Sequence, residues 1–178
     1  MKRLVISLIA LCIASLSLVA QNSKGESNNL SIFSAPGTYI NLGDWIQPNF
    51  KNDGFNIGIN YEHQNRTIYV GPQLFIFPEL NDLTYIHLIG RFGFNKEWGK
   101  VNNKLRIFAG GRAGFVYRET GGLNYAMLGV EAGIQYTFKK GFFFQIAGSR
   151  NERTDSQLWS NRDSFMTNSL DFGVGVRF

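Results

Sequence analysis

The sequence predicts an all-β protein, an eight-stranded antiparallel transmembrane β-barrel. Apolar and polar residues alternate with a period of two along most of the chain after residue 30, which is typical of strands with one face in an apolar environment. The alternating segments are about ten residues long, the length that a tilted strand needs to cross a bilayer. There are eight of them, and an even number of antiparallel strands can close without leaving an unpaired edge in hydrocarbon.

The first twenty residues have the form of a secretory signal peptide. Two basic residues precede an apolar stretch that is too short for a convincing membrane-spanning helix, and small residues follow it. We therefore expect residues 1–20 to be removed, leaving 21–178 as a single barrel domain. Removal would discard Cys12, the one cysteine, so no disulfide is expected. It would also lower the formal charge from +5 to about +3, because two basic residues are lost. That charge is too small to indicate nucleic-acid binding.

Seven of the eight segments alternate clearly. The alternation is weaker in the first predicted strand, which lies between Leu30 and Gly43. The clear segments span 55–62, 68–76, 85–94, 105–118, 126–136, 142–149 and 170–178. Pro72 interrupts the second of these and removes a donor from the ladder, which a bulge could absorb.

The two faces of these strands differ in composition. One face is rich in Ile, Leu, Val and Phe, whereas the other mixes small and amide residues with charges. Eight strands enclose a bore that side chains just fill, so we expect the apolar face to meet lipid and the charges to lie inside. Buried charges need partners, and Glu131 and Asp171 are therefore expected to contact some of the interior arginines. The predicted lumen network consists of Arg91, Arg106, Arg112, Glu131, Asp171 and Arg177.

The connections fall into two sets, with short turns on one side and long loops on the other. This is the asymmetry expected between periplasmic and outer ends of a membrane barrel. The first set is His63–Arg66, Lys139–Gly141 and a medium connection at Lys96–Asn103. The second set is Asp44–Asp53, Asn151–Asp163, Pro78–Asp82 and Thr120–Gly122.

The last strand carries apolar residues at alternate positions up to a terminal aromatic. These residues are Leu170, Phe172, Val174, Val176 and Phe178. The pattern resembles the assembly signal of bacterial outer-membrane proteins, and residues 30–178 as a whole look like a small barrel of OmpX- or OmpW-like architecture in the style of Bacteroidetes proteins. No subfamily is matched. The resemblance implies recognition by the barrel-assembly machinery through strand pairing, contact with outer-membrane lipid, and location in the bacterial cell outer membrane.

No catalytic, cofactor-binding or metal-binding motif appears in the sequence. His63 is expected at a turn in solvent, and His87 is expected in the lumen without a serine partner nearby in sequence. A pair of carboxylates such as Glu131 and Asp171 can do acid–base work, but compensation of the interior arginines explains the same two residues. We therefore expect no enzymatic activity and no cofactor.

The function predicted on these grounds is structural or one of recognition, carried by the outer loops 44–53 and 151–163. Exposed aromatic and charged loop residues are the recognition candidates, namely Trp45, Phe50, Arg153, Trp159 and Arg162. The alternatives are a small-solute-binding or transport barrel of the OmpW type, a lipid A-modifying enzyme, and a secreted soluble barrel or sandwich whose apolar faces form an interior. Membership of an envelope protein complex stays open.

Overall fold

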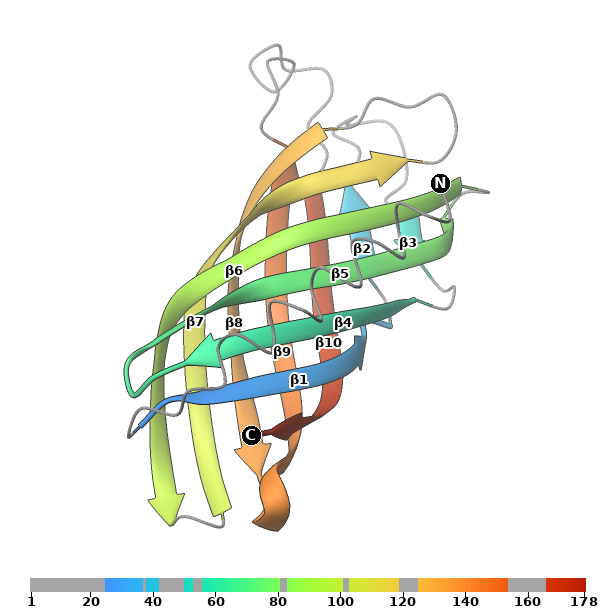
Figure 1. Ribbon diagram of the computed structural model, residues 1–178. Helices are drawn as coiled ribbons and strands as arrows, with labels where there is room; N and C mark the ends of the chain where they lie inside the picture. Colours follow the sequence, from blue (N-terminus) through green and yellow to red (C-terminus); the bar gives the residue numbers. More distant parts are fainter. Residues whose placement is uncertain are drawn as a thin grey trace, which may run out of the picture.

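The chain forms a closed antiparallel barrel in the computed structural model, which describes residues 25–36, 38–41, 50–52, 56–80, 83–100, 103–118, 125–153 and 166–178 (Figure 1). Eight strands pair in the order β1-β4-β5-β6-β7-β8-β9-β10, and β10 pairs back to β1. Their bounds are β1 Ser27–Ser34, β4 Ile57–Gln64, β5 Ile68–Leu80, β6 Leu83–Lys100, β7 Asn103–Arg118, β8 Tyr125–Thr137, β9 Phe142–Arg153 and β10 Met166–Arg177. The predicted fold class is confirmed. Among the described residues, no helix is long and apolar enough to span a membrane.

The predicted first strand is present but divided. After β1, a second piece, β2 (Thr38–Asn41), pairs with the start of β10, and β3 (Phe50–Asn52) then pairs with β2. Part of the predicted loop 44–53 is therefore strand. At the break after β1, the Asn56 side chain takes the place of a neighbouring backbone. Its Oδ1 accepts a hydrogen bond from the Ala35 amide at 2.7 Å, and its Nδ2 donates one to the Ala35 carbonyl at 2.9 Å.

The predicted connection at Lys96–Asn103 is wrong, because β6 continues to Lys100 and β7 begins at Asn103. The two-residue alternation also continues here, with Trp98 exposed and Glu97 turned partly inward. Charged residues on both faces concealed this strand in the sequence. The link predicted at Pro78–Asp82 is shorter as well, since β5 extends to Leu80 and β6 starts at Leu83.

Pro72 lies within β5 without the bulge suggested for it. The pairing of β5 with β6 keeps one register through this position, and the register with β4 is the same on both sides of a gap opposite Tyr61 and Glu62. Pro72 therefore lies where the ladder between β4 and β5 is interrupted, and it does not change the register of β5 with either neighbour. The one irregularity between β5 and β6 lies further on, between Phe77 and Leu80.

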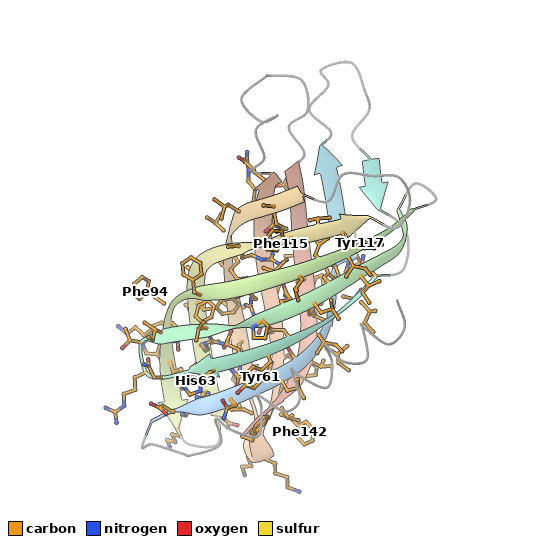
Figure 2. All side chains as sticks on the ribbon, turned by 45° about the horizontal axis from the view of Figure 1, so that its top comes forward. Tyr61, His63, Phe94, Phe115, Tyr117 and Phe142 are labelled. Carbon is orange, nitrogen blue, oxygen red and sulfur yellow. The ribbon has the colours of Figure 1, made fainter. Side chains whose placement is uncertain are left out.

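Side chains alternate between a polar interior and an apolar exterior, as the sequence predicts. Arg91 and Arg106 are among the largest fully buried side chains, at 1% and 0% exposure. Outward-facing Phe94, by contrast, is 70% exposed, and Figure 2 shows Phe94, Phe115 and Phe142 on the outside of the barrel. The apolar belt thus surrounds the barrel instead of forming its core.

The two ends of the barrel differ in how the strands are joined. One end, called here the turn end, carries the β4–β5 turn, the β6–β7 connection, the β8–β9 turn at η1 (Lys139–Gly141) and the C-terminus. In the η1 turn, Lys140 and Gly141 have φ of 69° and 82°, a left-handed conformation that reverses the chain within three residues. At the opposite end, called the far end, the strands are connected by segments that include 42–49 and 154–165.

Candidate functional site

The centre of the lumen is an ion-paired cluster built from three strands. Arg91 on β6 donates from Nε to both carboxylate oxygens of Glu131 on β8, at 2.9 Å each, and its Nη2 lies 2.8 Å from Oε1. Tyr69 on β5 donates its hydroxyl to the same Oε1 at 2.7 Å. All three residues are buried, so the pair is shielded from water and highly directional.

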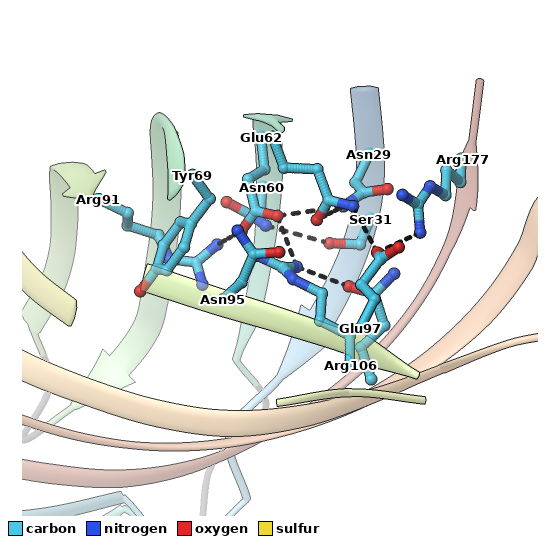
Figure 3. Close-up of polar contacts among 12 residues, drawn as sticks. Asn29, Ser31, Asn60, Glu62, Tyr69, Arg91, Asn95, Glu97, Arg106 and Arg177 are labelled. Atoms are coloured by element: carbon cyan, nitrogen blue, oxygen red, sulfur yellow. Dashed lines mark hydrogen bonds and ion pairs between the residues drawn. The ribbon is translucent and has the colours of Figure 1, made fainter. Parts of the chain in front are cut away.

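Glu62 on β4 joins this cluster to a second arginine on the opposite wall. Arg106 on β7 lies 2.6 Å from Glu62 Oε1, and Arg91 Nη1 lies 3.5 Å from Oε2 (Figure 3). Asn29 donates to Glu62 at 3.1 Å, and Arg106 also donates to Gln135 at 2.8 Å. The network therefore crosses the bore in the middle of the barrel.

Two aromatic rings fill the space between these guanidinium groups. Arg106 lies 5.1 Å from the ring centroid of Tyr69 and 4.9 Å from that of Phe108, and Arg91 lies within 6 Å of both rings. The two rings meet edge to face at 5.6 Å. Stacked cations and rings leave the centre of the bore occupied by side chains.

At the turn end, Glu97 on β6 joins side chains from three other strands across the mouth of the bore. It accepts hydrogen bonds from Gln64 on β4 at 2.7 Å, Lys104 on β7 at 3.2 Å and Arg177 on β10 at 2.5 Å (Figure 3). β6 and β10 lie on opposite sides of the barrel, so this carboxylate links walls that share no ladder.

Towards the far end the lumen is polar but less completely paired. Arg112 bonds to Gln73, and its Nε lies 3.6 Å from Glu131 Oε2. Asp171 on β10 is buried but makes no ion pair with a described arginine side chain. His87 is also buried there, edge-on to the Phe75 ring at 6.2 Å.

The structure thus brings five of the six predicted lumen residues into ion pairs, whereas Asp171 forms no ion pair with a described arginine. Arg177 pairs with Glu97, a carboxylate that the sequence analysis assigned to a turn. Glu62 alternates with the apolar positions Ile57, Ile59 and Tyr61 in the segment 55–62, and this alternation was the signal that could have placed it in the network.

The other predicted residues are distributed as follows. Trp45, Trp159 and Arg162 lie outside the described residues, while Phe50 begins β3 and Arg153 ends β9 at the far end. The residues of the predicted assembly signal lie on the exposed outer face of β10 and at the C-terminus. The backbone of Phe178 exchanges two hydrogen bonds with Asn28, of 2.8 and 2.9 Å, at the seam between β10 and β1.

His63 does not occupy a turn. It lies on β4 beside Tyr61 on the outer face, where its Nδ1 is 3.0 Å from Asn28 Oδ1 and the Tyr61 hydroxyl donates to the same oxygen at 2.8 Å (Figure 2). Within the described part of the chain, no group of three or more His, Cys, Asp or Glu could hold a metal ion.

No protein-family model matches the chain, and no curated protein matches it. The solved structures that are similar across almost the whole chain include the following two. Neisserial surface protein A aligns with a TM-score of 0.58 and 12% identity, covering 89% of this chain and all of the other. The attachment invasion locus protein Ail of Yersinia pestis aligns with a TM-score of 0.50 and 15% identity, covering 88% of this chain and all of the other. The chain therefore has the fold of the small outer-membrane β-barrels.

Proposed function

We propose that this chain is a non-enzymatic protein of the bacterial outer membrane, with a sealed lumen and a structural or recognition role at its far end. The observation that carries the proposal is the combination of an ion-paired, side-chain-filled bore with an apolar outer surface. A soluble ligand-binding barrel would need those apolar faces in its interior, where the structure has charges.

The height of the apolar belt supports insertion in a membrane. On the outer face of β9, residues from Phe142 to Gly148 are apolar, and charge first appears at Arg150 and Glu152. At a rise of about 3.3 Å per residue and a tilt of about 40°, Phe142 to Arg150 spans roughly 20 Å along the barrel axis. That approaches the band of about 25 Å seen in outer-membrane barrels.

The filled bore argues against the transport alternative. A conducting barrel needs a continuous aqueous path, but Glu62, Arg91 and Arg106 meet across the centre and Glu97 spans the turn-end mouth. The same pairing argues against acid–base chemistry by Glu131, because both of its oxygens are engaged by Arg91.

A recognition role rests on the placement of the longer connections. The strands deliver 42–49 and 154–165 to the same end of the barrel, whereas the turn end is closed by short turns. Trp45, Phe50, Arg153, Trp159 and Arg162 remain the proposed contact residues. Residues 1–20 as a leader and the alternating residues of β10 as the signal for the assembly machinery belong to the same proposal.

Location and orientation can be tested by cysteine labelling in intact cells. Ser156→Cys and Lys139→Cys are introduced separately into the full chain and exposed to a membrane-impermeant maleimide. We expect Ser156→Cys to react in intact cells and Lys139→Cys to react only after permeabilisation. Labelling of Lys139→Cys in intact cells would contradict the orientation, and labelling of both variants in the soluble periplasmic fraction would contradict the membrane location.

The sealed lumen is tested separately, by planar-bilayer recording on the purified full chain. We expect no stable conductance steps. A reproducible open channel would overturn the sealed bore and favour the transport alternative.

A further inference from the structure

Exposed side-chain charge at the turn end is almost entirely basic. The exposed basic side chains described there, called here the basic rim, are Arg66, Lys96, Lys100, Lys139 and Lys140. Among the described residues at this end, Glu26 is the exposed acidic one. Glu97 does not offset the rim, because it is partly buried and bonded to Arg177, Lys104 and Gln64.

The rim forms an arc along neighbouring hairpins. Arg66 lies in the turn between β4 and β5, the next two lysines end β6, and the last two form the turn between β8 and β9. The strands from β4 to β9 are neighbours in the barrel wall, with β7 lying between the β6 lysines and the β8–β9 turn. The rim therefore follows the turn end from the β4–β5 turn to the β8–β9 turn.

Aromatic residues fix the depth of the rim relative to lipid. On the outer face of β6, Lys96 stands between Phe94 and Trp98, and its Nζ lies 5.4 Å from the Trp98 ring centroid. Beside the β8–β9 turn, the Phe138 ring meets Tyr136 at 4.8 Å and Phe144 at 5.5 Å, each edge to face. Exposed aromatic girdles mark the boundary between hydrocarbon and headgroups, so the rim amines lie at the depth of lipid phosphates.

We propose that the basic rim binds the phosphate headgroups of anionic phospholipids in the leaflet at the turn end. The inference rests on the proposed membrane location. A lipid is the partner that the geometry favours, because Lys96 projects from the belt between two lipid-facing aromatics. Near an anionic membrane surface each basic side chain contributes about 1 kcal/mol, which corresponds to a roughly five-fold preference for an anionic over a neutral lipid at one contact.

Trp98 offers a local reporter of the lipid beside the rim. With Trp45→Phe and Trp159→Phe in the full chain, Trp98 is the remaining tryptophan. The protein is reconstituted in phosphatidylcholine bilayers containing brominated phosphatidylglycerol or, at equal fraction, brominated phosphatidylcholine. The ratio of quenching by the two lipids then measures the preference for the anionic headgroup next to Lys96 and Lys100.

We expect brominated phosphatidylglycerol to associate roughly five-fold more strongly. The preference should fall close to one in the Lys96→Gln/Lys100→Gln variant and decrease in high salt. It should be unchanged in the control Arg150→Gln, which removes an exposed cation at the far end. Inorganic phosphate should lower the preference no more than chloride at the same ionic strength, because the rim takes its phosphate from the bilayer.

Equal quenching by both lipids in the parent protein would contradict the binding of anionic phospholipids by the basic rim. An unchanged preference in the Lys96→Gln/Lys100→Gln variant would contradict it as well. A stronger effect of phosphate than of chloride would show that the site takes free anions and would overturn the lipid assignment. Absence of quenching by either brominated lipid would show that the barrel is not in the bilayer, and the proposed function would fail with it.

Discussion

Neutralising Glu131 should destabilise the barrel far more than neutralising Glu152. Glu131→Gln preserves the size of the side chain but removes the charge that faces the Arg91 guanidinium. Glu152→Gln makes the same chemical change in an ion pair with Arg150, where the distance is 3.0 Å. The pairs differ mainly in environment, since the Glu131 side chain is 2% exposed and that of Glu152 is 53% exposed.

The expected magnitudes follow from this difference. In Glu131→Gln, Glu62 is the one described carboxylate that stays paired with Arg91, at 3.5 Å, and Arg112 loses the carboxylate at 3.6 Å. Removing one partner from a buried ion pair costs about 3–5 kcal/mol. The exposed pair is screened by solvent, and its loss should cost about 0–1 kcal/mol.

Reversible urea unfolding of the full chain in lipid vesicles, followed by tryptophan fluorescence, measures both free energies of unfolding. The dependence of the free energy of unfolding on urea concentration should be the same in both variants, because unfolding exposes the same surface area in each. A cost below about 1 kcal/mol for Glu131→Gln, or costs that are equal for the two variants, would refute the view that this pair is a main support of the lumen. The double variant Arg91→Gln/Glu131→Gln should lose less than the sum of its single variants, because the Arg91 charge is removed together with its main partner.

Two further predictions concern the backbone. Gly93→Ala should lower the free energy of unfolding by about 1–3 kcal/mol, because the added methyl group would clash with the Ala109 carbonyl oxygen. Gly90→Ala on the same strand is the control and should cost little, because the nearest atom to its methyl group would be 3.6 Å away. Urea unfolding measures both. Asn56→Ala should lower the free energy of unfolding by about 1–3 kcal/mol, because it leaves the buried backbone of Ala35 without both side-chain hydrogen bonds; a loss within error would show that the break after β1 does not depend on this side chain.

The fold could be predicted from the sequence because the two faces of each strand lie in different solvents. Apolar residues at positions such as Ile107 and Val130 face outward, and the opposite parity carries charge, so period two is visible through most of the chain. The signal failed where that contrast disappears. At Lys96 and Lys100 even the outer face is charged, and the last five residues of β6 therefore looked like a connection.

The pairing inside the lumen was less predictable than the direction of the side chains. The alternation of positions between the two faces of a strand indicates that Glu131, Asp171 and Arg177 face the bore. The ion-pair partner of each also depends on the strand register and on its height along the barrel axis. Arg177 lies at the last turn-end position of β10, so it meets Glu97, while Asp171 lies six residues further up the strand. Strand register is set by ladder pairing across the whole wall, which alternation within one strand does not specify.

The lumen contacts also explain how the barrel can close as one unit. Hairpins such as β6–β7 can form from neighbouring residues, but the Glu62–Arg106 and Glu97–Arg177 pairs join strands that share no ladder, and the second pair joins residues 80 positions apart. The Glu97–Arg177 contact brings β10 against β6 on the opposite side of the barrel. Its free energy is therefore added when the barrel closes. The contacts that fill the bore are therefore the same contacts that join opposite walls of the barrel.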